Sequence, residues 1–236
     1  MSLKTVFFDA YGTLLELENY YHDLSAQVLD GVGCGINQHH FWEAWNDEFN
    51  AIIFNIIEGQ RPFMNTRTTY RVSLENALLR YGVSVSDKQL DELNKMCKTL
   101  LDQRCTILPS TRGVIEALKR KGVKIGLISN GDNDELSHHL GDLAGLFDAT
   151  TISESVRAYK PDAKIFQAAL NGLETNPTEA LFIGDNLRVD VNGANKAGIR
   201  SVWYNKDGKH SADGIKPHFT ITSMNEVLEI VKLLYR

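Results

Sequence analysis

Four short polar clusters in the sequence contain side chains suited to chemistry. They are Asp9 with Thr13, Ser129 with Asn130, Lys160, and Asp185 with Asp190. A carboxylate can act as a nucleophile, hydroxyl and amide groups can hold the oxygens of a transferred group, and an ammonium group can balance the negative charge of both. If the fold brings these clusters together, they predict covalent attack on an anionic substrate.

Apolar runs of strand composition precede three of the clusters and must position them. Thr5–Phe8 is β-branched and aromatic and runs directly into Asp9. After Pro109 strands alternate with helices. The predicted strands are 123–129, 149–153, 180–185, 201–204 and 218–221, and the predicted helices are 114–118, 135–143, 163–170, 189–197 and 224–234.

This alternation predicts an α/β fold with a doubly wound, mostly parallel sheet covered by helices on both faces. Ligands of such sheets bind outside the carboxyl ends of the strands. Because the polar clusters lie at strand ends, they are expected to meet at that edge. A carboxylate such as Asp9 directly after a buried strand is costly without a purpose, which favours a functional role.

Between the first strand and Pro109 the pattern is helical, with no convincing strand from about 17 to 104. Apolar residues recur at helical spacing in four segments, 20–29, 41–57, 70–79 and 90–101. Ser86 with Gln89 forms a candidate capping box for the last of them. We therefore expect a core domain of residues 1–15 and 106–236 and an inserted helical cap of residues 16–105, with hinges near 14–16 and 106–109.

Composition excludes several classes of protein. The chain has 236 residues, 43% hydrophobic and 23% charged, with a net charge of -5. These values are typical of soluble globular chains rather than disordered ones. Without a long basic run, no nucleic-acid partner is expected. No apolar run approaches the roughly 20 residues that span a bilayer, so no membrane association is expected.

The three cysteines, Cys34, Cys97 and Cys105, do not form a CxxC pair. An odd number without such spacing argues against a disulfide framework and against structural zinc. The N-terminus also lacks the pattern of a signal peptide. We therefore expect a cytoplasmic protein, while the sequence says nothing about its oligomeric state.

The polar clusters, in their order around a helical insertion, resemble the four motifs of the haloacid dehalogenase (HAD) superfamily of hydrolases. The matching segments are Asp9-Ala10-Tyr11-Gly12-Thr13, Ser129-Asn130-Gly131, Lys160-Pro161, and Gly184-Asp185 with Asp190. Each motif alone is weak, but four in order are specific, and the resemblance covers essentially the whole chain. It implies a Rossmann-like core with a helical cap inserted after the first motif.

The resemblance also implies a role for each matching residue. Asp9 would be the catalytic nucleophile, and Lys160 would be the catalytic counter-charge. A small-molecule substrate would be bound through its transferred group by Tyr11, Thr13, Ser129 and Asn130. Magnesium would be held by Asp9, Asp185, Asp190 and the main-chain oxygen of Tyr11, with Asp190 either supporting the metal or orienting Lys160. Oxygen-only ligands suit such a hard cation.

Each position also has a purely structural interpretation. Asp9, Ser129 and Asn130 are of types common in turns and caps. Asp190 is favourable near a helix N-terminus, and lysine is usually exposed. Gly12 and Gly184 are suited to tight turns, which is compatible with a functional site.

The first and fourth motifs indicate different reactions. Most phosphatases of the superfamily carry a second aspartate two residues after the nucleophile, where this chain has Tyr11, as in the metal-free 2-haloacid dehalogenases. Those dehalogenases have Ser-Ser-Asn in the fourth motif, whereas this chain has the phosphatase-like Gly184-Asp185-Asn186. They also have a tyrosine where this chain has Phe166. Where those dehalogenases have an arginine in the cap that binds the substrate carboxylate, this chain has Trp42-Glu43. Arg61, Arg67 and Arg71 are the alternatives that could take the role of that arginine.

The leading hypothesis is therefore a magnesium-dependent phosphatase that acts on a small phosphorylated metabolite through an aspartyl-phosphate. Tyrosine, with a pKa of about 10, is a poor acid–base group near pH 7, so phosphates with weakly basic leaving groups should react best. One alternative is a metal-independent 2-haloacid dehalogenase. Another is a HAD-like binding protein with little turnover, a hypothesis motivated by Tyr11.

Two further patterns have simple structural interpretations. The adjacent histidines 39–40 and 138–139 cannot share a helix face, so we expect them to be exposed. Trp42, Trp45 and Phe49 recur at helical spacing, which favours the core of the cap over a binding site.

Overall fold

The computed structural model describes residues 3–210 and 214–234. The chain divides into two compact units, which are described separately. The first comprises the chain up to Glu16 and from Ile107 onward, and the second comprises Leu17–Thr106. These crossing points lie beside the boundaries expected at 15–16 and 105–106. Residues 1–2, 211–213 and 235–236, all assigned to the expected core domain, lie outside the described part of the chain.

The first unit contains a six-stranded sheet in the order β5-β4-β1-β6-β7-β8. All its neighbouring strands are parallel. The strands are β1 (Thr5–Phe8), β4 (Lys124–Ser129), β5 (Ala149–Ile152), β6 (Ala180–Gly184), β7 (Arg200–Tyr204) and β8 (Phe219–Ile221). The prediction of a parallel α/β fold is confirmed.

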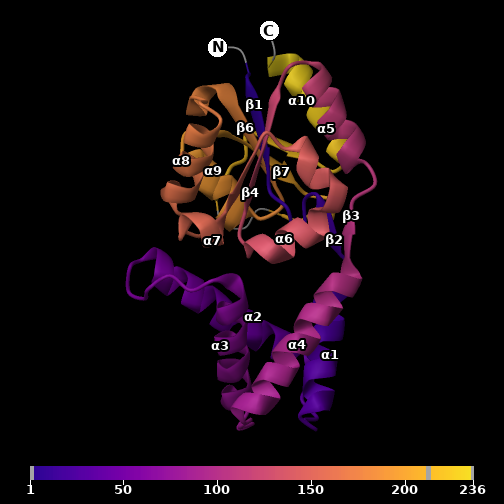
Figure 1. Ribbon diagram of the computed structural model, residues 1–236, viewed down its shortest axis with the longest axis vertical. Coiled ribbons are helices and arrows are strands. Elements are labelled where there is room, and N and C mark those ends of the chain that lie inside the picture. Colours follow the sequence, from indigo (N-terminus) through magenta and orange to yellow (C-terminus); the bar gives the residue numbers. More distant parts are fainter. Residues whose placement is uncertain (1–2, 211–213, 235–236) are drawn as a thin grey trace. The chain divides into compact units, whose positions relative to one another are not determined.

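Helices cover both faces of this sheet, as its parallel strands require. Helices α5 (Thr111–Arg120) and α10 (Val227–Leu234) lie on one face, and α8 (Ala163–Gly172) and α9 (Asn192–Lys196) lie on the other (Figure 1). Against the second face, Phe166, Phe182 and their neighbours form a buried apolar cluster. The sheet is therefore doubly wound.

Strand β1 lies at the point where the direction of winding changes. The chain runs from β1 to β4 and β5 on one side, and then returns to β6, β7 and β8 on the other. Phe8 pairs in register with Leu127 of β4 and with Ile183 of β6. The loops after these three strands consequently converge at the carboxyl edge, the place where such sheets bind ligands.

Short helices connect these strands and differ in detail from the prediction. α6 (Asn133–Leu140) ends before Gly141, and a 3-10 helix, η1 (Gly141–Leu146), follows where one helix through 143 was predicted. The predicted helix 189–197 is a π-helical turn, η3 (Leu187–Val191), followed by α9. Two further short elements were not predicted, α7 (Ser153–Val156) and η2 (Pro177–Glu179). The predicted helix 224–234 opens with a 3-10 turn, η4 (Met224–Glu226), before α10.

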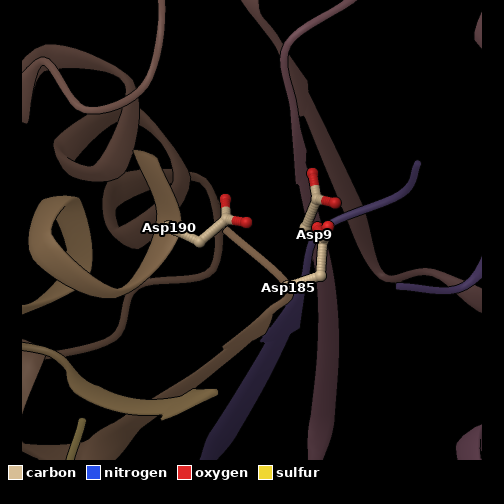
Figure 2. A group of neighbouring side chains, drawn as sticks. All are labelled: Asp9, Asp185 and Asp190. Atoms are coloured by element: carbon tan, nitrogen blue, oxygen red, sulfur yellow. The ribbon is translucent and has the colours of Figure 1, made fainter. Parts of the chain in front are cut away.

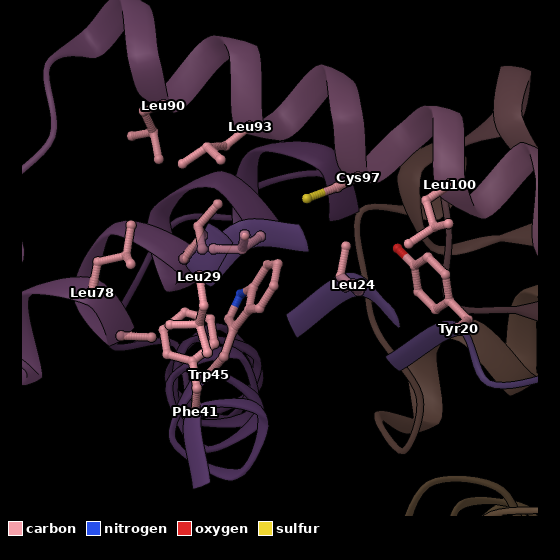
Figure 3. Close-up of a cluster of buried hydrophobic side chains, with 13 residues drawn as sticks. Tyr20, Leu24, Leu29, Phe41, Trp45, Leu78, Leu90, Leu93, Cys97 and Leu100 are labelled. Atoms are coloured by element: carbon pink, nitrogen blue, oxygen red, sulfur yellow. The ribbon is translucent and has the colours of Figure 1, made fainter. Parts of the chain in front are cut away.

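The second unit consists of four helices around its own core. They are α1 (Tyr20–Gly31), α2 (Gln38–Ile57), α3 (Thr66–Arg80) and α4 (Asp87–Arg104). Their inward faces bury a cluster that includes Leu24, Phe41, Trp45 and Cys97 (Figure 3). The capping box predicted at Ser86 and Gln89 is present at the start of α4.

Two short strands at the borders of this part of the chain were not predicted, although only Leu17 falls within the range 17–104 that was expected to lack strands. β2 (Leu15–Leu17) pairs with β3 (Cys105–Ile107) as a two-stranded sheet, where the chain passes between the units. Each strand has three residues, too few to produce a recognisable alternation. The predicted hinges therefore fall on or beside this ribbon.

Candidate active site

Three aspartates from two loops meet at the carboxyl edge of the sheet (Figure 2). Asp9 follows β1, Asp185 follows β6, and Asp190 lies in the π-helical turn η3. One carboxylate oxygen from each lies within 4.8 Å of the other two. The main-chain amide of Asp9 donates to the carbonyl of Ile183 at 2.8 Å, which fixes the end of β1 against β6. An oxygen-only donor set of this kind suits a hard divalent cation such as Mg²⁺.

Lys160 lies between two of these acids. Its Nζ donates to Asp9 Oδ1 at 2.5 Å and to Asp190 Oδ1 at 2.7 Å, and its side chain is only 2% exposed. The Asn130 side chain holds the lysine main chain on both sides, since Nδ2 donates to the Lys160 carbonyl at 3.1 Å and Oδ1 accepts from its amide at 2.8 Å. Asn130 was expected to bind the transferred group, but these contacts give its side chain the task of positioning Lys160.

Excess negative charge is a property of this cluster. When all three carboxyl groups are ionised, they and the single ammonium group carry a net charge of -2. Burial raises the pKa of Asp9 to about 6; Lys160 opposes this rise and Asp190 adds to it. The loss of water contacts, with repulsion from Asp190 and Asp9, raises the pKa of Asp185 to about 8, although its side chain is the most exposed of the three. A bound cation would relieve this repulsion.

Although burial alone would lower the pKa of Lys160, the charges of Asp190 and Asp9 hold it above its usual value. The side chain is therefore a cation at neutral pH, as the expected counter-charge must be.

Two glycines make room for the acids. Gly12 has a φ of +86°, and a Cβ there would lie 2.6 Å from an Asp185 carboxylate oxygen. A Cβ on Gly184 would lie 2.5 Å from atoms of the Asp190 side chain. Such distances are below any normal contact, so these glycines allow the close approach of the carboxylates and do more than form turns.

Ser129, at the end of β4, supplies a buried hydroxyl beside the acids' edge of the sheet. Its side chain is fully buried, and among the described residues its Oγ has no hydrogen-bond partner. An unpaired buried hydroxyl costs about 1–3 kcal/mol, so a ligand oxygen that accepts from it would recover that energy. This fits the expected binding of a transferred group. Thr13, also buried, donates to Asp185 Oδ1 at 3.4 Å.

Tyr11 forms a contact that the sequence did not predict. Its hydroxyl lies 2.9 Å from Nδ1 of His139 on α6, and the two rings meet edge to face. The expectation that both residues of the 138–139 pair are exposed was therefore wrong for His139, which is half-buried. A Cβ built on Gly131 would lie 3.6 Å from the Tyr11 ring and 3.9 Å from Ser129 Oγ. The tyrosine ring and the unpaired hydroxyl thus both border Gly131.

Other residues that support the site were also missed. Ser153 Oγ accepts from the Gly131 amide and donates to the Gly131 carbonyl, both at 3.0 Å, and so fixes the loop after β4. Trp203 Nε1 donates to the main-chain oxygen of Asp185 at 2.9 Å. The partners of these bonds lie 18 and 22 positions apart, and no local pattern marks them.

The family model of haloacid dehalogenase-like hydrolases matches residues 3–198, most of the chain. This chain belongs to the haloacid dehalogenase-like hydrolases. It is a hydrolase of that family, with the α/β core and the cap domain of its structural neighbours.

Relatives of this hydrolase have different activities in their names. It is 26% identical to (S)-2-haloacid dehalogenase 1 of Pseudomonas sp. (strain CBS-3), over 97% of this chain and 96% of that protein. It is 29% identical to the human N-acylneuraminate-9-phosphatase, over 98% and 94% respectively. The structure of the HAD-hydrolase YfnB from Bacillus subtilis bound to magnesium superposes with a TM-score of 0.80 at 19% identity, covering 98% of this chain and all of that one. The relatives thus support a hydrolase without selecting its reaction.

Two positions compared with dehalogenases take structural roles in this hydrolase. Phe166 is fully buried on α8 and packs edge to face on Phe182, with their centroids 5.4 Å apart. Arg71 on α3 donates to Asp87 and Asp91, each at 3.0 Å, at the surface of the cap. Both side chains are thus engaged within their own units.

No helix in the described part of this hydrolase is both long enough and apolar enough to cross a membrane.

Proposed function

We propose that this hydrolase is a magnesium-dependent phosphatase that acts on a small phosphorylated molecule through Asp9. The observation that carries the proposal is the cluster of Asp9, Asp185 and Asp190 within 4.8 Å, a set of oxygen ligands with more negative charge than Lys160 balances. Attack on carbon with loss of a halide needs one carboxylate nucleophile, and it gives no reason to gather three acids.

Asp9, Asp185 and the main-chain oxygen of Tyr11 would hold the ion, with Asp190 supporting it and orienting Lys160. When bound, Mg²⁺ supplies charge neutralisation at the phosphoryl oxygens. Without it, both a phosphate group and the nucleophile would face the same uncompensated negative charge.

In the proposed reaction an oxygen of Asp9 attacks phosphorus, and the bond from phosphorus to the leaving oxygen breaks. Lys160 offsets the charge of Asp9 and the substrate, while the hydroxyl of Ser129 donates to a phosphoryl oxygen. The Thr13 hydroxyl would do the same by exchanging Asp185 for the substrate as its acceptor. Water then attacks the aspartyl-phosphate, releasing phosphate and regenerating the Asp9 carboxylate. Although burial raises the pKa of Asp9, its value of about 6 is still below 7, so the nucleophile is largely ionised at pH 7 and above.

Tyr11 takes the position at which the family's phosphatases carry an acid. Its hydroxyl is hydrogen-bonded to His139. Since a phenol is a weak acid near neutral pH, substrates whose leaving groups need no proton, such as aryl, acyl or anhydride phosphates, should react faster than alkyl phosphates.

A second candidate function is dehalogenation of a short 2-haloacid. It is favoured by Tyr11 and by the match over 97% of the chain to a protein named as a haloacid dehalogenase. In that reaction Asp9 would attack carbon and a halide would leave without a proton.

The three free cysteines favour the cytoplasmic location that we propose for either enzyme.

The two candidates are separated by assaying phosphate release from p-nitrophenyl phosphate and chloride release from 2-chloropropionate, each with Mg²⁺ and with a chelator. The proposal predicts phosphate release only with Mg²⁺. Chloride release that persists in the chelator would replace the phosphatase proposal with the dehalogenase. If neither phosphate nor chloride is released, the hypothesis of a binding protein would be favoured.

A further inference from the structure

The cap contains a cavity of about 230 Å³ between helices α1, α2 and α3. Aromatic rings and two carboxamides line it: Trp42, Trp45, Phe49 and Tyr70, with Asn46 and Asn50. The expectation that the aromatic residues of α2 form cap core is correct for Trp45, which is 1% exposed (Figure 3). Trp42 and Phe49 are half-buried and present their rings to the cavity.

The rings of this cavity hold one another in place. Trp42 stacks on Tyr21 of α1 with their ring centroids 4.3 Å apart, and the ring centroids of Phe49 and Tyr70 of α3 are 4.6 Å apart. Trp45 stands perpendicular to Tyr70, and its indole N–H donates to Ser73 at 2.9 Å. A lining fixed in this way loses little side-chain freedom when a ligand enters, which favours binding.

The polar groups of the cavity are amides rather than charges. Asn46 and Asn50 are four residues apart on α2 and so lie on one face of the helix. Within residues 3–210 and 214–234, neither carboxamide forms a hydrogen bond to another group, and no charged side chain lines the cavity. Each amide offers both donors and an acceptor, which can pair with the edge of a heterocycle.

We propose that this cavity binds a planar, uncharged heteroaromatic ring of the nucleobase type. Aromatic faces stack on such rings, and carboxamides recognise their hydrogen-bonding edges. A water molecule occupies about 30 Å³ of liquid, so the cavity has room for about as many atoms as a substituted six-membered ring contains. A phosphate group does not fit this lining, because nothing in it offers positive charge. The proposal does not depend on the reaction that the core catalyses.

Calorimetric titration of the intact protein tests this proposal with three probes: uridine, adenosine and ribose 5-phosphate. At least one nucleoside should bind, whereas ribose 5-phosphate, which lacks the ring, should not bind in the cap. Trp42→Leu and Asn46→Leu should each weaken nucleoside binding by about tenfold or more. Phe54→Ala, on the same helix with a side chain that is 59% exposed and is not part of the cavity lining, is the matched control and should bind as the parent does.

Asn50→Leu serves as a second test if Asn46→Leu fails to fold, because Asn50 is exposed and its replacement disturbs no packing. The proposal is overturned if neither nucleoside binds, or if binding occurs but is unchanged in the Trp42 and Asn variants. The source of the ring is decided by a further arm. If the ring is part of the substrate, the nucleoside should compete with its own 5′-monophosphate. If the ring belongs to a separate effector, the nucleoside should change turnover without competing.

Discussion

At the scale of single residues, the sequence was sufficient to identify the charged groups of the site but not the contacts that arrange them. Asp9, Asp185, Asp190 and Lys160 lie together at the sheet edge, as strand order and motif resemblance predicted. The bond from Tyr11 to His139 joins residues 128 positions apart and depends on how α6 packs. Long-range contacts of this kind leave no local pattern in one sequence.

Replacement of Tyr11 tests its effect on the leaving group. Tyr11→Asp supplies the acid that the proposed phosphatase lacks, and general acid catalysis contributes about 10²–10⁴-fold. We expect the ratio of kcat for an alkyl phosphate to kcat for p-nitrophenyl phosphate to rise at least about tenfold. Tyr11→Phe, which removes the hydroxyl without adding an acid, is the control. An unchanged ratio in Tyr11→Asp would mean that the leaving group is protonated from elsewhere.

The glycines beside the acids provide a test of the cation site. Gly12→Ala and Gly184→Ala each place a methyl group within 2.6 Å of the Asp185 or Asp190 side chain and must displace it. We expect Mg²⁺ affinity, measured by calorimetry, to fall by about 10–100-fold. Gly145→Ala, which meets nothing within 4 Å, should bind as the parent does. Normal affinity in both site variants would argue that these acids do not hold the ion.

At the scale of elements, periodicity predicted the four cap helices but set three of their starts too late, although the capping box at Ser86 located the start of α4. α2 begins at Gln38 and α3 at Thr66, because the side chains of Asn37 and Asn65 accept hydrogen bonds from the first turns. Apolar spacing does not register these polar caps. The ribbon of β2 and β3 was missed for a different reason, since three-residue strands depend on pairing with each other.

Helix α4 carries a testable consequence of packing. Burial raises the pKa of Cys97 to about 12, well above its usual value near 9. Between these pH values the thiol ionises in the unfolded chain but not in the folded one, so the free energy of unfolding should fall as pH rises through this window. The Cys97 thiol lowers the free energy of unfolding by at most about 1.4 kcal/mol per pH unit within this window. Below pH 9 the thiol is protonated in both states and adds no dependence on pH.

The measurement is denaturant unfolding of the parent and of Cys97→Ala from pH 8 to pH 11, with the two slopes compared so that other titrating groups cancel. The parent should lose stability more steeply. Parallel slopes would show that the thiol ionises equally in both states.

At the scale of the whole molecule, one unit carries the acids and the other carries the aromatic cavity. A cation bound to the folded core alone stabilises it by about 2.7 kcal/mol at 100 times its Kd. Mg²⁺ should therefore raise the midpoint of thermal unfolding by about 5–10 °C. Asp185→Asn should abolish this shift, and Asp142→Asn, an exposed acid in the same unit, should keep it. Equal shifts in both variants would point to unspecific ionic effects.

The central claim is that Asp9 becomes phosphorylated. Its most direct test is mass spectrometry of enzyme quenched in acid during turnover of p-nitrophenyl phosphate with Mg²⁺, for the parent and for Asp9→Asn. We predict a phosphoryl group on the peptide that contains Asp9 in the parent and none in the variant. Phosphate release without any modification of Asp9, or an organic ester on Asp9 after incubation with 2-chloropropionate, would contradict the account.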